Sequence, residues 1–386
     1  MRPALVATSA VIILGLLASA FAAEGGPPKV GVAETANQSG TTSYPPGHEG
    51  HVTTTQDYAL SNDLLTYALR YTADVDKAHA PYVSPVEGYI GMPQPTSCNW
   101  YHSGFMRVII DGDDIGRYPL GDFSALDSGE RGLVRMVWDY PGGQVRISFV
   151  LEPGARDLLC QILLRPKTKP KSVVVSLVCY PSAFTSWMHR KGAREVVTPA
   201  SIIREGEDKT LPGAANWWAF YEDGVFDVAR GEGEGPCAML AMPRQVKTVR
   251  FQPTDYPVST TLELDPDQTD FRFAFWDMAG VTNADGLKLM QTSAAPVLAH
   301  LLTEDFRPLI VQRPNVDALR AELAKIVVAV GPSDTTKKAE AALAEAAQSL
   351  EAARNGDWQA EKKLAALLHQ YDDMVWDLRI SALFAQ

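Results

Sequence analysis

The chain has 386 residues, of which 46% are hydrophobic and 21% are charged, a composition typical of folded globular proteins. This length exceeds one minimal domain and indicates two folded units. The formal net charge of −11 repels phosphate backbones and anionic lipid surfaces, so no nucleic-acid partner is expected.

The first 22 residues have the pattern of a signal peptide. Arg2 is followed by an apolar run, and Ala20 and Ala22 form an Ala-x-Ala cleavage pattern. We therefore predict a signal peptide over residues 1–22 and a protein that is secreted or periplasmic after cleavage. An uncleaved anchor is the alternative, because the apolar run is nearly long enough to span a bilayer.

Two further segments precede the main domain. Residues 23–56 are rich in Gly, Pro, Ser and Thr, which predicts a flexible leader. Residues 57–80 carry apolar side chains at helical spacing between Leu60 and Tyr71, which predicts one short helix.

From residue 81 to residue 283 the apolar pattern has a period of two. Short alternating segments are separated by turns such as Pro-Gly-Gly at 141–143, and no long helix is expected between them. This pattern predicts a mainly β fold, a large antiparallel β-sandwich of supersandwich or jelly-roll type. The residues predicted to face its core are Val145, Ile147, Phe149, Phe271, Phe273 and Phe275.

The C-terminal part changes to a period of 3.6. After a connecting segment at 284–312, residues 313–386 contain three amphipathic stretches preceded by Asn315, Ser333 and Asp357, which are good helix caps. Short turns between them predict an α-helical hairpin or three-helix module. We expect this module to be the contact surface of any homo-oligomer.

The exported location permits disulfide bonds. Cys160 and Cys179 flank a turn rich in Lys and Pro, centred near Lys169, and a symmetric hairpin there would place them opposite each other. This predicts a Cys160–Cys179 disulfide. The alternative is two reduced thiols packed as small core residues.

The stretch from Ser97 to Phe105 concentrates polar and aromatic side chains. On a strand, Asn99 and Tyr101 would share the outer face while Trp100 and His102 face the core. An acid–base pair of Tyr101 and His102 would then require a bulge. We therefore predict Asn99 and Tyr101 as a ligand-binding patch and keep Tyr101 as a catalytic candidate.

Three acids follow in and after a turn, namely Asp111, Asp113 and Asp122. The Asp111-Gly112 pair is a hairpin-turn signal. Gathered carboxylates would suit calcium, but Ile115 occupies a position where a calcium loop requires a ligand. We expect an ordinary solvated turn and no cofactor, with calcium as the alternative.

A basic segment at 181–194 stands out in this acidic chain. Its candidate ligand-binding residues are Trp187, His189, Arg190 and Arg194. An aromatic ring stacks on the apolar face of a sugar, and arginine binds a carboxylate or sulfate, so this combination suits an anionic glycan. An exposed loop with a packed tryptophan is the alternative. His189, and Glu222 in the later segment 216–224, are the other catalytic candidates.

Two resemblances support a carbohydrate context. The segment Pro-Leu-Gly-Asp-Phe at 119–123, after an Asp-rich turn, resembles a motif of jelly-roll glycoside hydrolases of the fructofuranosidase type. The alternating strands across 81–283 resemble the galactose-mutarotase-like supersandwich of many carbohydrate-active proteins. These resemblances imply a polysaccharide or glycan partner, and they transfer no catalytic residue to this chain.

The sequence thus favours a protein that binds extracellular carbohydrate. The first alternative is a glycoside hydrolase or polysaccharide lyase that uses a groove of the sandwich. The second is a structural protein of cell-envelope assembly. Fold class by itself does not choose among them.

Overall fold

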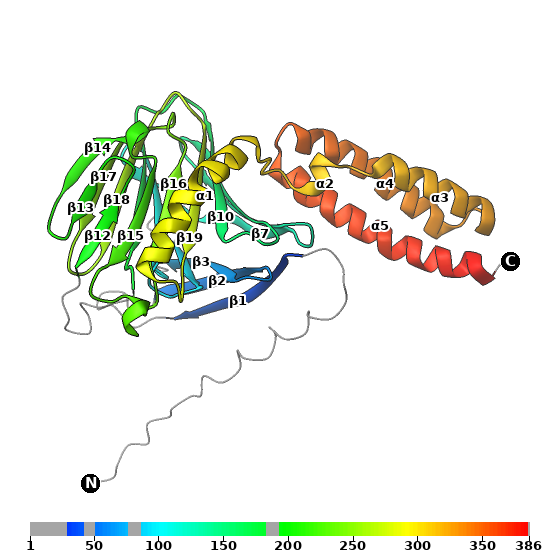
Figure 1. The fold of residues 1–386 in the computed structure, drawn as a ribbon. Coiled ribbons are helices and arrows are strands. Elements are labelled where there is room, and N and C mark those ends of the chain that lie inside the picture. Colours follow the sequence, from blue (N-terminus) through cyan, green and yellow to red (C-terminus); the bar gives the residue numbers. More distant parts are fainter. Residues whose placement is uncertain (1–28, 42–50, 76–85, 183–192, 385–386) are drawn as a thin grey trace, which may run out of the picture.

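The computed structural model describes residues 29–41, 51–75, 86–182 and 193–384. Two large antiparallel sheets face each other, and a group of helices extends from them as an arm (Figure 1). The predicted mainly β fold with C-terminal helices is confirmed. The predicted signal peptide lies outside the described residues. Among those residues, no helix is long and apolar enough to cross a membrane.

The first sheet has ten strands and is antiparallel throughout. In spatial order its strands are β1 (Gly31–Thr41), β2 (Val52–Ser61), β3 (Thr66–Val75), β4 (Val86–Gln94), β5 (Met106–Ile110), β11 (Val173–Cys179), β18 (Val258–Leu264), β17 (Val246–Pro253) and β14 (Lys209–Pro212), with β6 (Asp113–Asp114) paired to β5. Asp111 and Gly112 form the predicted turn between β5 and β6, and both have positive φ.

The second sheet has nine antiparallel strands. In spatial order they are β13 (Ile202–Arg204), β12 (Arg194–Val197), β15 (Trp218–Asp223), β16 (Cys237–Ala241), β19 (Asp270–Asp277), β10 (Asp157–Pro166), β9 (Gly143–Leu151), β8 (Gly132–Tyr140) and β7 (Leu120–Asp127). Consecutive strands from β7 to β10 are neighbours, so this half of the sheet is a simple meander.

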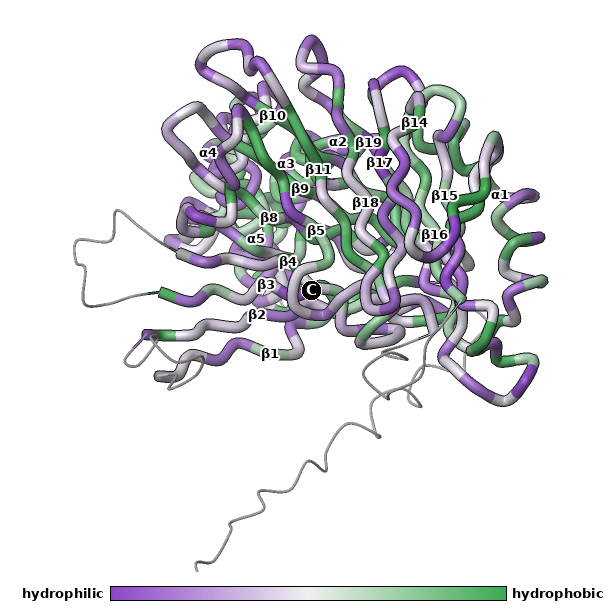
Figure 2. The backbone as a smooth tube through the Cα atoms, turned by 90° about the vertical axis from the view of Figure 1, so that its left-hand side faces the viewer, coloured by the Kyte–Doolittle hydropathy of each residue, from purple (hydrophilic) through white to green (hydrophobic). Residues whose placement is uncertain are grey.

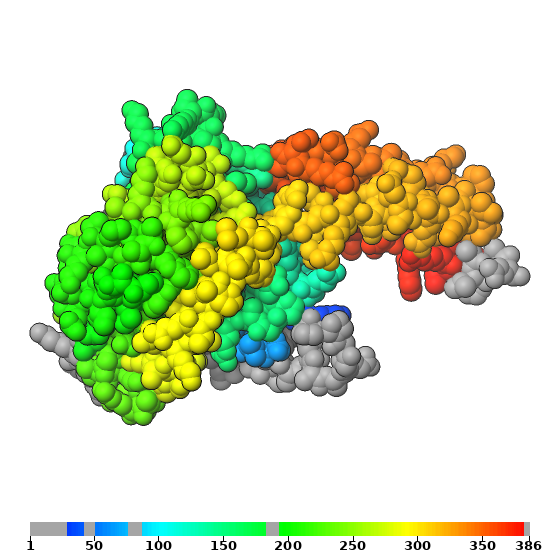
Figure 3. Space-filling view, turned by 45° about the horizontal axis from the view of Figure 1, so that its top comes forward, coloured from blue at the N-terminus to red at the C-terminus, as the bar shows by residue number. Residues whose placement is uncertain are grey.

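An apolar core fills the space between the sheets. The six predicted core residues are all at most 1% exposed, and hydrophobic stretches mark strands such as β10 and β11 in Figure 2. Part of the outer face of the nine-stranded sheet is buried too, because Ala274 and Trp276, which alternate with the core phenylalanines, are at most 1% exposed. Helix α1 (Asn283–Thr303) lies across this outer face and packs on it through Met290 and other apolar residues (Figure 3).

The helix predicted over 57–80 is wrong, because strands β2 and β3 occupy most of that segment. The side chain of Asn62 accepts hydrogen bonds from the backbone N–H groups of Leu64 and Leu65, which closes a tight turn between the two strands. After this turn the buried residues Tyr67, Leu69 and Tyr71 alternate, which is strand periodicity.

The flexible leader predicted over 23–56 is also wrong for residues 31–41, which form strand β1. This strand is hydrogen-bonded along its length to β2 and lies at the edge of the ten-stranded sheet. Its side chains are almost all exposed or half-buried, so the sequence carries few apolar residues there despite the regular backbone. The polar composition of this segment suggested a leader, whereas backbone hydrogen bonds to β2 make it an edge strand.

The symmetric hairpin that suggested a disulfide is absent. Strand β10 pairs with β9 and β19, whereas β11 pairs with β5 and β18 in the other sheet. The turn near Lys169 thus crosses between sheets. Cys160 and Cys179 are both buried in the core, and no disulfide joins them.

The three predicted C-terminal helices are α3 (Val316–Val330), α4 (Asp334–Arg354) and α5 (Trp358–Phe384). Ser333 caps α4 through its hydroxyl, and Asp357 accepts from the backbone of the first turn of α5. A separate apolar core holds these helices together with α2 (Leu309–Gln312). The predicted connecting segment, residues 284–312, thus contains α2 and most of α1, which continues as a helix through Pro296.

Replacing Phe273 by Ala should lower the free energy of unfolding by about 3–5 kcal/mol, because both the transfer and cavity terms apply to a fully buried ring. The measurement is chemical denaturation followed by tryptophan fluorescence. Thr261→Ala on β18, whose side chain is half-buried, is the control and should change stability by less than about 1 kcal/mol. Equal effects of the two substitutions would contradict the assignment of the core.

Candidate functional site

The stretch from Ser97 to Phe105 is a compact turn and not a strand. The backbone N–H of His102 donates to the Ser97 carbonyl at 3.2 Å, and the N–H of Tyr101 donates to Val178 on β11 at 3.2 Å. A Cβ at Gly91 would lie 1.9 Å from the His102 carbonyl oxygen, so only glycine lets β4 approach the turn this closely. This turn places Tyr101 and His102 beside each other.

Trp100 anchors the turn in the core. Its ring is fully buried and contacts Phe105, Tyr221 and Phe275 edge to face, with centroids 5.3–5.6 Å apart. Its indole N–H donates to the Trp276 carbonyl at 2.9 Å. The backbone of the turn is therefore rigidly attached to both sheets.

Asn99 is fully buried, which contradicts its prediction as a surface ligand-binding residue. Its side-chain amide donates to Asp277 at 3.1 Å and to the Pro236 carbonyl at 3.3 Å. The hydroxyl of Thr96 donates to the same carboxylate at 2.6 Å. Asn99 and Asp277 thus fix the turn from below, and neither contacts the surface.

A cluster of three tyrosines lies above this support. Tyr180 is 5% exposed and contacts Tyr101 and Tyr256 edge to face, with centroid distances of 5.1 and 5.0 Å. Tyr256 is 43% exposed and Tyr101 is half-buried. Burial raises the pKa of Tyr180, and the neighbouring Tyr256 and Tyr101 add to the increase, so the hydroxyl remains protonated. We call these three residues the tyrosine cluster.

His102 lies next to the tyrosine cluster and contacts one of its members. Its ring contacts Tyr101 with centroids 4.7 Å apart, which corrects the expectation that the two side chains point apart. Its Nδ1 lies 2.9 Å from the Ser97 carbonyl oxygen. Since a carbonyl only accepts, Nδ1 carries a proton, and Nε2 is the ring atom that can accept one.

Arg194 lies behind the cluster and is 0% exposed, so the prediction that it binds a ligand at the surface is wrong. Its guanidinium stands over the Tyr180 ring at 6.0 Å and lies 3.7 Å from Asp223. Burial lowers its pKa, and the Asp223 carboxylate opposes this shift. This position indicates that Arg194 holds the Tyr180 ring in place.

Glu222 does not join Tyr101. It lies on the outer face of the nine-stranded sheet, in register with Glu195 on β12. Burial raises its pKa, and the charges of Glu195 and two nearby aspartates add to the increase. The turn that carries Tyr101 packs on β11 of the other sheet, so the two catalytic candidates belong to different surfaces.

The other predicted ligand residues, Trp187, His189 and Arg190, lie outside the described residues. The aspartates do not gather into a metal site: Asp111 accepts from the backbone at Lys171 and Ser172, Asp113 from Tyr118, and Asp122 from Ser124 and Lys362. Each carboxylate is therefore used by a separate local contact.

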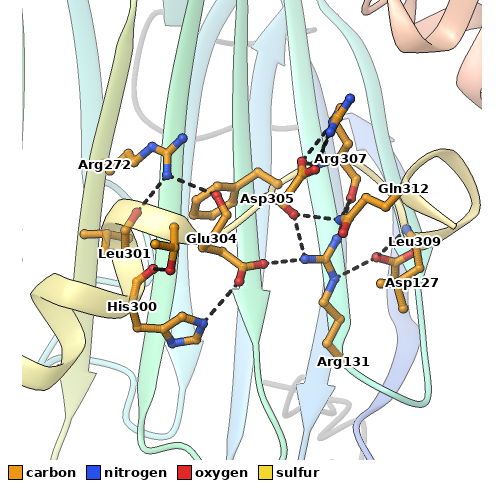
Figure 4. A network of polar contacts seen from close by, with 12 residues as sticks. Asp127, Arg131, Arg272, His300, Leu301, Glu304, Asp305, Arg307, Leu309 and Gln312 are labelled. Atoms are coloured by element: carbon orange, nitrogen blue, oxygen red, sulfur yellow. Dashed lines mark hydrogen bonds and ion pairs between the residues drawn. The ribbon is translucent and has the colours of Figure 1, made fainter.

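In the part of the chain that the structure describes, one group has metal-ligand chemistry. Ligand atoms of Glu152, His300 and Glu304 lie within 4.8 Å of one another. His300 Nε2 is 3.2 Å from Glu304, and Arg131 forms an ion pair with the same carboxylate. A cation there would compete with that guanidinium. The network in Figure 4 instead connects α1 and the following segment to the nine-stranded sheet.

A second surface feature is a cleft of about 310 Å³ between the nine-stranded sheet and the turn joining α4 to α5. Its floor contains Arg135, Ser148, Gln161 and Arg272, which are direct neighbours across β8, β9, β10 and β19. The six arginines that line the cleft are Arg135, Arg146, Arg165, Arg272, Arg307 and Arg354.

Sequence reasoning missed Tyr180, Tyr256, Asp277 and the arginine-lined cleft. Asp277 continues the inward row of Phe271, Phe273 and Phe275, and a charged residue at a core position was the available signal. The tyrosines come from segments about 75 to 155 positions apart along the chain, so no local pattern connects them.

No protein-family model matches this chain, and no curated protein matches it. Solved structures match this chain at low identity and low TM-score. One is an α-N-acetylgalactosaminidase from Bifidobacterium bifidum, with 10% identity and a TM-score of 0.37, covering 72% of this chain and 40% of that one. This chain thus spans less than half of that enzyme's length.

A putative aldose 1-epimerase from Escherichia coli K12 has 9% identity and a TM-score of 0.33, covering 57% of this chain and 98% of that one. A chondroitinase AC lyase has 10% identity and a TM-score of 0.30, covering 62% and 39%. These neighbours are carbohydrate-active enzymes, and the epimerase is of the galactose-mutarotase-like kind that the sequence resembles. Because the TM-scores are low, we transfer no residue role from them.

Asp277→Asn should change how stability depends on pH. Burial raises the pKa of Asp277 from 3.8 to about 6. Between these values the folded protein keeps a proton that the unfolded chain has lost, so this carboxyl stabilises the fold below about pH 4 and loses that contribution as pH rises through 6. The wild type should thus lose about 3 kcal/mol that the variant keeps.

The measurement is urea denaturation of both proteins between about pH 4 and pH 7. The stability of the variant minus that of the wild type should rise across this range. Asp208→Asn is the control: Arg250 lowers the pKa of that exposed carboxyl below 3.8, so its stability difference should be nearly constant between about pH 4 and pH 7. A constant difference for Asp277→Asn would show that the buried carboxyl is ionised throughout.

Proposed function

We propose that this chain is an exported glycan-binding protein whose ligand rests on the exposed edge of the tyrosine cluster. The observation that carries the proposal is that two partly exposed tyrosines, Tyr101 and Tyr256, share one buried support, Tyr180. Rigid aromatic rings with hydroxyl groups present both an apolar face for a sugar ring and polar atoms for its hydroxyls. The N-terminal signal-peptide pattern supports export.

The rigidity of the support favours binding. Trp100, Asn99 and Asp277 fix the turn under Tyr101 through buried hydrogen bonds, so little conformational freedom is lost when a sugar binds. The preference for an anionic glycan, the role of Trp187 and Arg190, and homo-oligomer contact through the helices remain predictions. Trp376, which is 62% exposed on α5, belongs to the surface that such contact would use.

Replacing both Tyr101 and Tyr256 by Ala should weaken retention on a bound polysaccharide by about tenfold, because two stacking surfaces are removed. Affinity electrophoresis over a panel of neutral and acidic polysaccharides measures this. The control is Tyr118→Ala with Tyr140→Ala, a second half-buried tyrosine pair with centroids 6.1 Å apart. If the wild type binds no polysaccharide, or both double variants bind equally, the proposal fails.

A second candidate function, hydrolase or lyase activity on the same glycan, is favoured by the contact between Tyr101 and His102. In a neutral His102 with its proton on Nδ1, Nε2 is a proton acceptor on a ring that contacts a phenol ring, a pair of residue types suited to acid–base chemistry. The second alternative, a role in envelope assembly, would require neither residue.

His102→Ala separates binding from catalysis. If the protein only binds, this variant should keep its affinity for polysaccharide within about threefold and the wild type should release no oligosaccharide, as followed by chromatography of the mixture. Release of oligosaccharides by the wild type and its loss by a factor of about 100 or more in His102→Ala would instead establish catalysis.

A further inference from the structure

The arginine-lined cleft has more positive charge than its own acids neutralise. Six arginines and three carboxylates line it, in a chain whose net charge is −11. Its floor consists of two adjacent rows across the nine-stranded sheet: the row from Arg135 to Arg272, and the next row, which contains Arg146 and Leu163. Strand pairing alone brings these polar side chains to one face.

Four of the six arginines have carboxylate partners. Arg135 pairs with the buried Glu361, Arg272 with Asp270, and Arg307 with Asp305. Arg354 is 3.9 Å from Glu351, and both of these side chains are exposed. These carboxylates therefore neutralise the positive charges of the four arginines.

Arg146 and Arg165 differ from the other four. In the part of the chain that the structure describes, neither forms an ion pair with a carboxylate. Arg146 donates to the side chain of Gln144 at 2.7 Å and to the Gly356 carbonyl at 2.6 Å. Arg165 donates to the Asn355 carbonyl at 3.2 Å. Both guanidinium groups therefore lie at the C-terminal end of α4.

Carbonyl groups at a helix end carry only about half a negative charge, so they do not neutralise two guanidinium ions. Arg146 is 4% exposed. Burial lowers its pKa to about 10, and the nearby Arg165 and Arg135 contribute further to the decrease, whereas the charges of Glu361 and Asp357 oppose it only in part. A buried positive charge next to other positive charges is unfavourable unless an anion accompanies it.

The turn between α4 and α5 keeps the two arginines close together. Gly356 has φ of +80°, and a Cβ there would lie 1.7 Å from Nη2 of Arg165. Any other residue would displace either the helix turn or the guanidinium. The glycine thus permits the close approach that forms one wall of the cleft.

The geometry points to a binding site for a tetrahedral oxyanion, sulfate or phosphate, at Arg146 and Arg165. Guanidinium groups bind such oxygens through paired charge-assisted hydrogen bonds. A cleft of about 310 Å³ has room for the oxyanion together with part of a sugar ring that bears it. The site is separate from the tyrosine cluster and does not depend on glycan binding there.

Isothermal titration calorimetry of the full chain with sodium sulfate and with sodium phosphate, at constant ionic strength set with chloride, tests the site. We expect saturable binding with one ion per chain. Arg165→Gln should weaken it by about tenfold, because one charged donor pair is lost. Arg165 is exposed, so the variant should fold, which circular dichroism verifies.

The matched control is Arg230→Gln, since Arg230 is also exposed and donates to a backbone carbonyl, that of Gly224 at 2.7 Å. This variant should bind as the wild type does. Absence of saturable binding of every oxyanion probe, or equal weakening by the two substitutions, would overturn the proposal. In that case the arginines serve only to hold the helices.

A second arm identifies the source of the oxyanion. A sulfated disaccharide and its unsulfated counterpart are titrated under the same conditions. Binding of the sulfated form at least about tenfold tighter than free sulfate supports recognition of a sulfated saccharide. Equal affinity for free sulfate and the sulfated disaccharide supports a site for the free ion. Both results require that Arg165→Gln weakens the binding.

Discussion

The placement of the helices depends on charged side chains on the outer face of the nine-stranded sheet. Arg135 is buried there and requires a counter-charge, which Glu361 in the first turn of α5 provides. Arg131 likewise binds Asp127, Glu304 and carbonyls of the segment after α1. Apolar packing covers only part of this face, through α1, so the remaining part is held to the helices by ion pairs and hydrogen bonds. Ion pairs and hydrogen bonds therefore help to position the arm of helices, in addition to hydrophobic contact.

The same constraint separates two kinds of surface on one sandwich. At the tyrosine cluster, buried polar groups serve only as a foundation: Asp277, Asn99 and Thr96 satisfy one another, and aromatic rings reach the solvent above them. At the cleft, buried polar groups form the lining. The positive charge of Arg146 and Arg165 there exceeds the partial negative charge of the carbonyl groups that they contact. The first surface is suited to uncharged sugar rings and the second to an oxyanion. A sulfated or phosphorylated saccharide would offer both chemistries.

Much of the architecture was predictable because it follows from local periodicity. The alternation at Phe271, Phe273 and Phe275 identified a sheet face, and Ser333 and Asp357 marked helix starts that the structure contains. The errors arose where local pattern and long-range pairing disagree. Edge strand β1 has almost no buried side chains, so it resembled a leader, and the segment from Leu60 to Tyr71 combined two strands whose joint spacing imitates a helix. Cys160 and Cys179 flank a turn that crosses between sheets, which spacing along the chain does not reveal.

For the candidate site, the sequence by itself determined which side chains were available and identified Tyr101 from its polar and aromatic neighbours. It did not determine where they point. Asn99 and Arg194 are of residue types that bind ligands, yet both are fully buried, because their hydrogen-bond and charge partners, Asp277 and Asp223, come from distant strands. Tyr180 and Tyr256 meet Tyr101 only after β11 and β18 pair, and the cleft exists only because α4 ends against β9 and β10. Local composition specifies periodicity and caps, whereas convergence of distant side chains depends on strand order and on neutralisation of buried charge, which the tertiary structure decides.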